Sequence, residues 1–325
     1  MQLSTVLKPL SKQNLRLAAQ CGVDGYVARY PGDSYDDLLA VKQRVEAEGL
    51  KVVAVEGFLP IEKIKLGTDH DGEELEAMKR LIVHMGRAGV PVLCYNWMAG
   101  TDWVRTTLDA RERGGAKVTA FDLADAEKAV KLDHSGGGDF QAEQTLDKMD
   151  ADSLWKNLAA FLEAILPIAE EAGVNLAMHP DDPPLPELFG DARIMNSVEN
   201  FERLVGLVES PRNGICYCQA NFVAMGAKVP DAIRRLGKHT KYVHFRDVRG
   251  TSESFVETFH DNGPTDMAEA IQLLKDAGFA GPIRPDHVPQ LEGEGNENPG
   301  YTMLGRLYAF GYIRGLLQAA ESKSS

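Results

Sequence analysis

The sequence predicts an α/β fold, a (β/α)8 TIM barrel with a long insertion after the fourth strand, and three observations lead to it. Short apolar runs alternate eight times with amphipathic stretches along the 325 residues, as strands and helices alternate in such a barrel. Several apolar runs lack a polar–apolar alternation, which is typical of strands covered on both faces. Glycine follows several amphipathic stretches, where it can close the last helical turn. We therefore expect residues 1–325 to form a single barrel domain.

Each predicted strand is a short apolar run, often rich in β-branched residues, and each predicted helix is the amphipathic stretch that comes after it. In chain order, strand then helix, the pairs are 3–7 with 11–21, 25–30 with 35–48, 51–56 with 72–88, 90–95 with 151–172, 174–179 with 197–209, 214–218 with 229–237, 241–245 with 267–277, and 281–286 with 301–320. Gly49, Gly89, Gly173 and Gly278 come directly after four of these helices. They mark the predicted helix ends.

One segment breaks this rhythm. Residues 97–149 contain no comparable alternation of strand and helix, and a structureless loop of that length is uncommon inside a compact domain. The segment follows the fourth predicted strand, so in a barrel it lies over the C-terminal face. It is expected to be a lid, a hairpin insertion or an oligomer contact, with a tolerated surface insertion as the alternative.

Composition excludes several classes of protein. The chain is 44% hydrophobic and 26% charged, which is ordinary for a globular domain and excludes a disordered or collagen-like chain. No apolar run approaches the roughly 20 residues that span a bilayer. The formal net charge of −13 repels phosphate backbones and anionic lipid, so we expect neither a nucleic-acid nor a membrane partner. Four cysteines and no recognisable signal peptide favour a reducing cytoplasm.

Four consecutive predicted strands each end in a residue that can bind a transition metal. These residues are His179, Cys218, His244 and Asp286. The C-terminal ends of barrel strands converge on one rim, where the active sites of such barrels lie, so we expect the four side chains to meet. Two imidazoles, a thiolate and a carboxylate can together hold one divalent transition metal.

Each of these residues taken alone has an ordinary structural explanation. A strand-end histidine is more often a hydrogen-bonded structural group, a cysteine in an apolar run is usually a small buried apolar residue, and a carboxylate at a helix start is commonly a cap. Their recurrence at the same structural position favours the metal. Cys216 shares a face with Cys218, since the two are two residues apart on a strand. Cys218 lies nearer the loop, so we expect it to be the ligand, while Cys216 and Cys94 fill the interior.

Other polar residues are expected at the same rim. His287 directly follows the last candidate ligand and is a candidate proton donor or acceptor. Arg246 and Arg284 are candidates to bind a substrate carboxylate, because guanidinium groups bind carboxylates with two hydrogen bonds. Ion pairs with nearby aspartates are the alternative. His260 lies in the loop after the seventh predicted strand and either faces the substrate or caps a turn.

The sequence resembles the mannonate dehydratase family, a group of xylose-isomerase-like barrels, over most of its length. The matching motifs are Ile64-Lys65-Leu66-Gly67, Cys94-Tyr95-Asn96-Trp97-Met98, Asp102-Trp103-Val104-Arg105-Thr106, His179-Pro180-Asp181-Asp182-Pro183-Pro184, Cys218-Gln219, His244-Phe245-Arg246-Asp247, Phe259-His260-Asp261-Asn262-Gly263 and Arg284-Pro285-Asp286-His287. The resemblance implies a divalent metal, Mn²⁺ or a similar ion such as Fe²⁺, at the four strand-end residues. It also implies His287 and Tyr301 as the acid–base pair, and we add Arg105 to the candidate substrate-binding residues.

The reaction implied by the resemblance is the conversion of D-mannonate to 2-dehydro-3-deoxy-D-gluconate and water, with His287 and Tyr301 not yet assigned as acid or base. The implied partner is a small sugar acid, and we expect a homo-oligomer, a dimer or higher. The alternatives are a sugar isomerase or epimerase on the same barrel, or a dehydratase of a different aldonate. A DNA-repair endonuclease of related fold disagrees with the net charge of −13, and a non-catalytic sugar-acid binding protein stays open.

Overall fold

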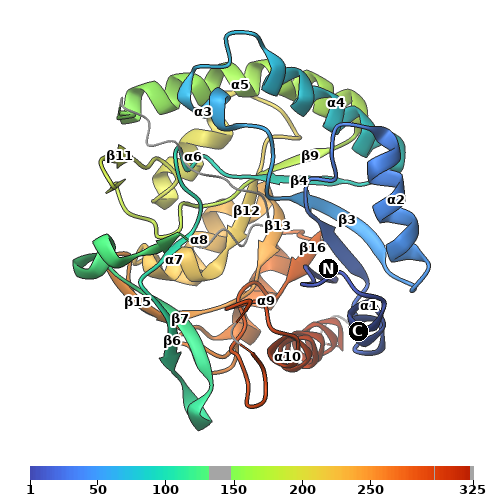
Figure 1. The fold of residues 1–325 in the computed structure, drawn as a ribbon, viewed down its shortest axis with the longest axis vertical. Coiled ribbons are helices and arrows are strands. Elements are labelled where there is room, and N and C mark those ends of the chain that lie inside the picture. The colour runs from blue at the N-terminus through green and yellow to red at the C-terminus, as the bar shows by residue number, and fades with distance from the viewer. Residues whose placement is uncertain (132–147, 296, 323–325) are drawn as a thin grey trace.

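The centre of the computed structural model is a closed barrel of eight parallel strands (Figure 1), in a structure that describes residues 1–131, 148–295 and 297–322. The barrel strands are β1 (Gln2–Thr5), β2 (Gly25–Ala28), β3 (Lys51–Glu56), β4 (Val92–Tyr95), β9 (Asn175–Met178), β12 (Ile215–Cys218), β13 (Thr240–His244) and β16 (Pro282–Arg284). Each overlaps a predicted strand, and β16 pairs with β1 to close the ring. The predicted (β/α)8 barrel is confirmed.

Within the described residues, eight longer helices surround the barrel on its outer side (Figure 1). They are α1 (Lys12–Gln20), α2 (Tyr35–Glu46), α4 (Glu73–Ala88), α5 (Ala151–Ala172), α6 (Val198–Leu207), α8 (Val229–Leu236), α9 (Met267–Asp276) and α10 (Met303–Ser322). Side chains fix several of their starts: Ser34 and Asp37 form a capping box before α2, which satisfies free N–H groups of the first turn. Gly89 and Gly173 adopt the left-handed conformation after α4 and α5, as their positions predict.

A second, smaller sheet lies beside the barrel and was not predicted. Its strands are antiparallel, in the order β14-β15-β7-β6. They are β6 (Thr107–Arg111), β7 (Lys117–Asp122), β14 (Val248–Thr251) and β15 (Ser254–Glu257). The pairs β5 (Val104–Arg105) with β8 (Val130–Lys131), and β10 (Glu187–Leu188) with β11 (Asp191–Ala192), are shorter still. The short helices α3 (Glu62–Leu66), α7 (Gln219–Ala224), η1 (Arg113–Gly115), η2 (Leu123–Lys128) and η3 (Gly237–His239) complete the described elements.

The second sheet joins two loops at the same end of the barrel. Strands β6 and β7 belong to the predicted insertion at 97–149, and β14 and β15 belong to the loop after β13. Strands β6 and β7 pair as an antiparallel hairpin, which is one of the alternatives predicted for the insertion. Residues 132–147 lie outside the described residues. The function of the insertion as a lid stays a prediction. Of the helices within the described ranges, none has the length and apolar character needed to cross a bilayer.

Candidate active site

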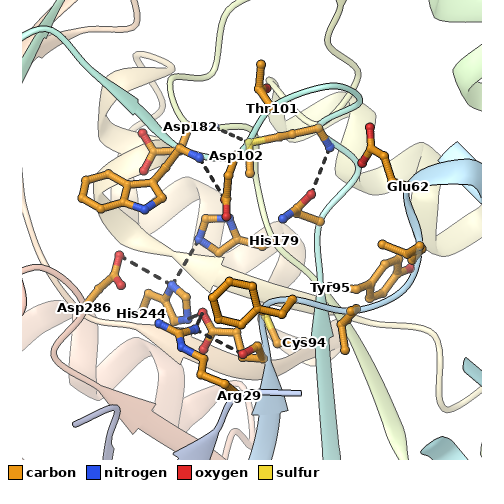
Figure 2. A pocket seen from close by; sticks show the side chains of 18 of the residues that line it. Arg29, Glu62, Cys94, Tyr95, Thr101, Asp102, His179, Asp182, His244 and Asp286 are labelled. Carbon is orange, nitrogen blue, oxygen red and sulfur yellow. Dashed lines mark hydrogen bonds and ion pairs between the residues drawn. The ribbon is translucent and has the colours of Figure 1, made fainter. Parts of the chain in front are cut away.

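A cavity of about 150 Å³ opens at the C-terminal ends of the barrel strands (Figure 2). Three of the four predicted metal ligands, His179, His244 and Asp286, line it together with polar and aromatic side chains from other strands and loops. Trp103, from the predicted insertion, is part of the wall. The predicted rim and the observed cavity therefore lie at the same end of the barrel.

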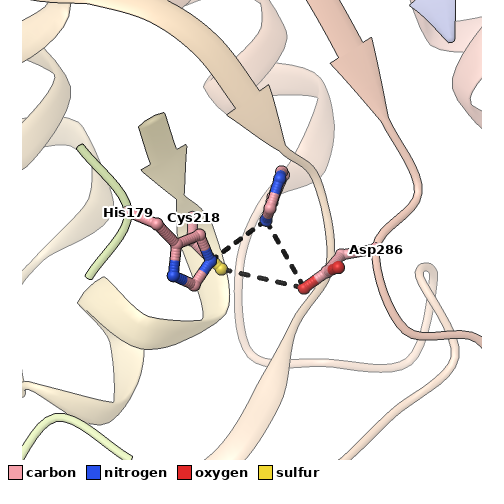
Figure 3. Close-up of side chains that lie close together, drawn as sticks. His179, Cys218 and Asp286 are labelled. Carbon is pink, nitrogen blue, oxygen red and sulfur yellow. Dashed lines mark hydrogen bonds and ion pairs between the residues drawn. The ribbon is translucent and has the colours of Figure 1, made fainter. Parts of the chain in front are cut away.

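The four strand-end residues meet beside this cavity (Figure 3). One possible ligand atom from each of His179, Cys218, His244 and Asp286 lies within 4.8 Å of the others. His179 Nε2 is 3.1 Å from His244 Nδ1, His244 Nδ1 is 3.6 Å from Asp286 Oδ2, and Cys218 Sγ is 4.0 Å from the same oxygen. Strands β12 and β13 end at Cys218 and His244, whereas His179 directly follows β9. We call these four residues the ligand cluster.

The charge states in the ligand cluster fit a divalent transition metal. Burial, and next the neighbouring His244, lower the pKa of His179 to about 4, so the imidazole is neutral near pH 7 and has a lone pair to donate. Burial raises the pKa of the Cys218 thiol, so a cation that binds there must displace a proton. Burial alone would raise the pKa of Asp286, but its neighbours His287 and Arg284 hold it well below its usual value. Nitrogen, sulfur and oxygen donors suit a transition metal better than Mg²⁺ or Ca²⁺.

Glu56, at the end of β3, contacts the candidate ligand His244 on the side of the ring away from the other ligands. Its Oε1 lies 3.4 Å from His244 Nε2, the ring nitrogen that points away from His179. The same carboxylate pairs with Arg284 at 2.7 Å and accepts a hydrogen bond from the Tyr242 hydroxyl at 3.0 Å. A carboxylate behind a metal-binding histidine fixes its ring orientation and tautomer. Sequence reasoning missed this residue, although its position at the end of a predicted strand was a usable signal.

His287 is fixed by a second carboxylate. Its Nδ1 lies 2.6 Å from Glu257 Oε1, and its ring packs against Trp103 with 4.1 Å between ring centroids. Burial alone would raise the pKa of Glu257, but His287, Arg246 and Arg105 together hold it well below the usual range. The carboxylate therefore accepts the Nδ1 proton, which leaves Nε2 as the nitrogen with the lone pair in the neutral ring.

Tyr301 completes this side of the cavity. Its ring centroid is 5.4 Å from that of His287, and Arg306 lies 4.8 Å from the ring centroid. Arg306 also donates to the backbone oxygen of Asp286 at 3.4 Å, so one buried guanidinium supports both residues. Burial, and next the negative charge of Asp286, raise the pKa of Tyr301. The phenol is therefore protonated near neutral pH and can donate a proton.

Arg105 and Arg246, two predicted substrate-binding residues, lie outside the cavity lining. Arg105 forms hydrogen bonds with both carboxylate oxygens of Asp182, at 2.7 and 3.0 Å, and with Glu257 at 2.7 Å. Arg246 bonds to Asp182, Glu257 and Asp286 at 2.8, 3.2 and 2.6 Å. Both side chains are at most 1% exposed. Internal carboxylates pair with both guanidinium groups, which hold Asp182, Glu257 and Asp286 in place.

His260 is also buried and absent from the cavity lining. Neither of its ring nitrogens has a hydrogen-bond partner among the described residues. Burial, and next Arg306, lower the pKa of His260 to about 4, so it is neutral near pH 7. The geometry therefore gives it no direct contact with the cavity, unlike the predicted substrate-binding role.

The cavity contains three other cationic side chains, of which only Arg284 was predicted. Arg284 is paired with Glu56 and, at 2.7 Å, with Asp286. Lys65 from α3 is hydrogen-bonded to Asn96, Glu62 and the backbone of Met98. These two cations are already neutralised inside the protein.

Arg29 has a longer carboxylate contact than either, 3.9 Å from Nη1 to Glu56 Oε1. Only its Nη1 has a hydrogen bond, to the Glu56 backbone at 3.2 Å, whereas Nε and Nη2 are buried and have no partner within the described ranges. It lines the cavity and directly follows β2 (Figure 2). Unpaired buried donors on a cation are costly unless a ligand satisfies them. Sequence reasoning missed Arg29, although a charged residue in the predicted strand at 25–30 was a signal.

Comparison with known proteins gives a consistent result across the chain. A family model described as D-mannonate dehydratase matches residues 8–325. The mannonate dehydratase of Oceanobacillus iheyensis is 33% identical over 305 residues, which cover 89% of this chain and 87% of that protein. The mannonate dehydratase of Thermotoga maritima is 35% identical over 312 residues, covering 88% of this chain and 86% of its relative.

Solved structures agree with the sequence comparison. The crystal structure of mannonate dehydratase from Streptococcus suis serotype 2 is similar with a TM-score of 0.86 and 30% identity, and the match covers 100% of this chain and 96% of that one. A D-tagatose 3-epimerase-like protein has a TM-score of 0.62 at 12% identity, with full coverage of both chains. At that identity the second likeness shows the barrel fold alone.

Proposed function

The chain belongs to the D-mannonate dehydratase family, and from this premise we propose that it is a hydro-lyase that converts D-mannonate to 2-dehydro-3-deoxy-D-gluconate and water. One observation carries the proposal: the ligand cluster stands beside a cavity that His287 and Tyr301 also line. Elimination of water from a sugar acid needs an electrophile near the carboxylate, a base for the C2 proton and an acid for the departing hydroxyl.

We propose that His179, Cys218, His244 and Asp286 hold a divalent metal, Mn²⁺ or a similar ion. When bound, such a metal polarises the substrate carboxylate and stabilises the negative charge that develops as the C2 proton leaves. One thiolate and one carboxylate neutralise the two positive charges of the ion. The centre can therefore accept an anionic substrate without net repulsion.

Arg29 is proposed to bind the substrate carboxylate. Its two unpartnered N–H groups are at the cavity wall, and a guanidinium binds a carboxylate with two parallel hydrogen bonds. Its contact with the Glu56 carboxylate is long, at 3.9 Å. The positive charge of the guanidinium can therefore still attract a substrate carboxylate. Arg29 replaces Arg246 and Arg105 in this role, because internal carboxylates saturate those two.

His287 and Tyr301 are proposed to move the two protons. Glu257 accepts from His287 Nδ1, so Nε2 takes the proton from C2. The electron pair of the C2–H bond forms the C2–C3 double bond, and the C3 hydroxyl leaves as water with a proton from Tyr301, whose raised pKa keeps it protonated. The resulting enol becomes the 2-keto product by proton transfer to C3. Acid–base assistance of this kind contributes roughly 10²–10⁴-fold to the rate.

The direct test is product analysis with the purified protein, Mn²⁺ and D-mannonate. A 2-keto-3-deoxy acid that has lost one water relative to the substrate is the expected product. A product of unchanged mass would instead show an isomerase or epimerase, and tight binding without turnover would show a binding protein. His287→Asn is the matched control, since it should retain the metal while kcat falls.

The proposed setting is the cytoplasm. All four cysteines are free thiols, and reduced cysteines are typical of that compartment. The homo-oligomer expected from the sequence stays a prediction, and light scattering of the purified protein would measure its mass.

A further inference from the structure

A second group of possible ligand atoms lies next to the ligand cluster and shares one residue with it. One ligand atom from each of Cys94, Cys216 and His244 lies within 4.8 Å of the others. The first two belong to no part of the proposed reaction, and the sequence assigned them only a space-filling role. We call these three residues the thiol site.

The barrel topology explains why the two cysteines meet. Cys94 is on β4 and Cys216 on β12, and these strands are separated by β9 alone. Inward side chains from alternate strands form one layer of a barrel interior. Cys216 lies two residues before Cys218 on β12, so it points inward one layer deeper. The thiol site is therefore directly below the ligand cluster.

The thiol site is buried but not closed off. Cys94 and His244 are both 1% exposed and Cys216 is 0% exposed, and the two cysteines belong to one cluster of buried hydrophobic residues. Cys94 and His244 nevertheless line the cavity (Figure 2). A small cation can thus reach these residues by the route that leads to the ligand cluster.

We propose that Cys94, Cys216 and His244 form a second cation site, selective for thiophilic ions such as Zn²⁺ and Cd²⁺. Two sulfur donors and one imidazole are a ligand set that such ions favour and that Mn²⁺, which prefers oxygen and nitrogen, does not. The ligand cluster offers only one sulfur. The first equivalent of a thiophilic ion should therefore enter the thiol site.

Occupation of the thiol site competes with the ligand cluster. A neutral imidazole has one nitrogen with a free lone pair, so His244 ligates one cation at a time. Binding converts two thiols into two thiolates, forms two metal–sulfur bonds and releases two protons to solvent. A thiophilic ion held by Cys94 and Cys216 thus removes His244 from the proposed catalytic centre, and such ions should inhibit the protein.

X-ray absorption spectroscopy of bound cadmium tests the proposal, because it counts sulfur ligands. The parent is Cys21→Ser, which removes the partly exposed thiol and leaves three cysteines. With one equivalent of Cd²⁺, the parent and its Cys218→Ser variant should both show two sulfur ligands per cadmium. Cys216→Val should show one, because cadmium then goes to Cys218.

One sulfur ligand per cadmium in the parent, unchanged in Cys216→Val, would overturn the proposal. If Cys216→Val does not fold, judged by circular dichroism, Cys94→Ala removes the other thiol and should lose the same ligand. The Cys218→Ser variant is a separate test, because only Cys94 and Cys216 remain in it as cysteines. Two sulfur ligands per cadmium in this variant can come only from the thiol site. None of these measurements uses turnover, so their result is separate from that of the proposed dehydratase activity.

Discussion

The two halves of the barrel rim supply different chemistry. Strands β9, β12, β13 and β16, in the second half of the chain, end at or beside the four residues of the ligand cluster. In the first half, Arg29 directly follows strand β2 and Glu56 is the last residue of β3. Neither belongs to the ligand cluster. The second half holds the metal ligands together with His287 and Tyr301. The first half holds Glu56, which contacts one ligand, and Arg29, which lines the cavity.

The halves meet at Glu56. Its carboxylate contacts His244 and Arg284 of the second half and lies 3.9 Å from Arg29 of the first half. The orientation of the candidate ligand His244 therefore depends on β3, a strand that supplies no ligand. Removing residues from each half should therefore separate metal loss from substrate loss, and the following changes test that division.

The largest effect is expected from Cys218→Ser in the ligand half. Loss of the sulfur ligand leaves three donor residues, so the protein should lose most of its divalent metal. A bound metal is worth several kcal/mol of transition-state stabilisation, so kcat/KM should fall by roughly 10³-fold or more. Metal content by mass spectrometry and kcat/KM are measured together. Cys216→Val is the matched control and should retain both; a Cys218→Ser protein with full metal and full activity would remove Cys218 from the ligand cluster.

Arg29→Gln tests the substrate half. Loss of two charge-assisted hydrogen bonds, each worth about 1.5–3 kcal/mol, should raise KM for D-mannonate by roughly 10²-fold or more while the metal content stays unchanged. Arg16→Gln, at an exposed ion pair with Glu48, is the control and should alter neither quantity. An Arg29→Gln protein with an unchanged KM would show that the substrate carboxylate is bound elsewhere, for example at Arg284.

The same comparison explains what could be read from the sequence. The ligand cluster was predictable because histidine, cysteine and aspartate recur at one structural position, and few other functions need those residue types there. Arg29 lies near the end of the predicted strand at 25–30 and Glu56 ends the one at 51–56, but charged residues are common at strand ends. Tertiary contacts decide which arginine can bind a substrate. Arg246 donates to three carboxylates, whereas the contact of Arg29 with the Glu56 carboxylate is 3.9 Å long.

The fold divides in a similar way. The barrel strands and long helices were predictable, because each carries its own apolar pattern. The sheet β14-β15-β7-β6 was not, since its strands are short and β7 pairs with β15 from a loop far along the chain. The end of β16 was also displaced: the prediction ran to residue 286, but the strand ends at Arg284. Pro285 explains the difference, because proline cannot donate a ladder hydrogen bond.

Glu56→Gln should have a smaller effect than loss of a ligand. Removal of the carboxylate behind His244 should weaken metal affinity by roughly 10–100-fold, although all four ligands remain. Glu257→Gln is the matched comparison, because Glu257 holds His287 and no ligand of the cluster directly; it should lower kcat and leave metal affinity near that of the wild type. Titration calorimetry with Mn²⁺ measures the affinities. If both variants lose affinity equally, the effect is general destabilisation and Glu56 has no special relation to His244.

His260→Gln should have the smallest effect on catalysis and should change how the free energy of unfolding depends on pH. His260 lies on the ligand half but outside the cavity lining, so KM for D-mannonate should stay within about twofold, the scale of a negligible free-energy change. A rise in KM comparable to that of Arg29→Gln would instead restore a substrate contact on this half and break the division between the two halves.

The stability effect follows from the buried neutral ring. Burial lowers the pKa of His260 to about 4, whereas the unfolded chain binds the proton near pH 6.5. Between these values the unfolded state binds more protons, so this histidine's contribution to stability is fully present near pH 7 and is lost as the pH falls from 6.5 to 4. The shift corresponds to roughly 3 kcal/mol at most. Urea unfolding of the metal-free protein from pH 7 to pH 4 should show wild type losing more stability than His260→Gln. Parallel curves would mean that the folded protein protonates this ring as readily as the unfolded chain does.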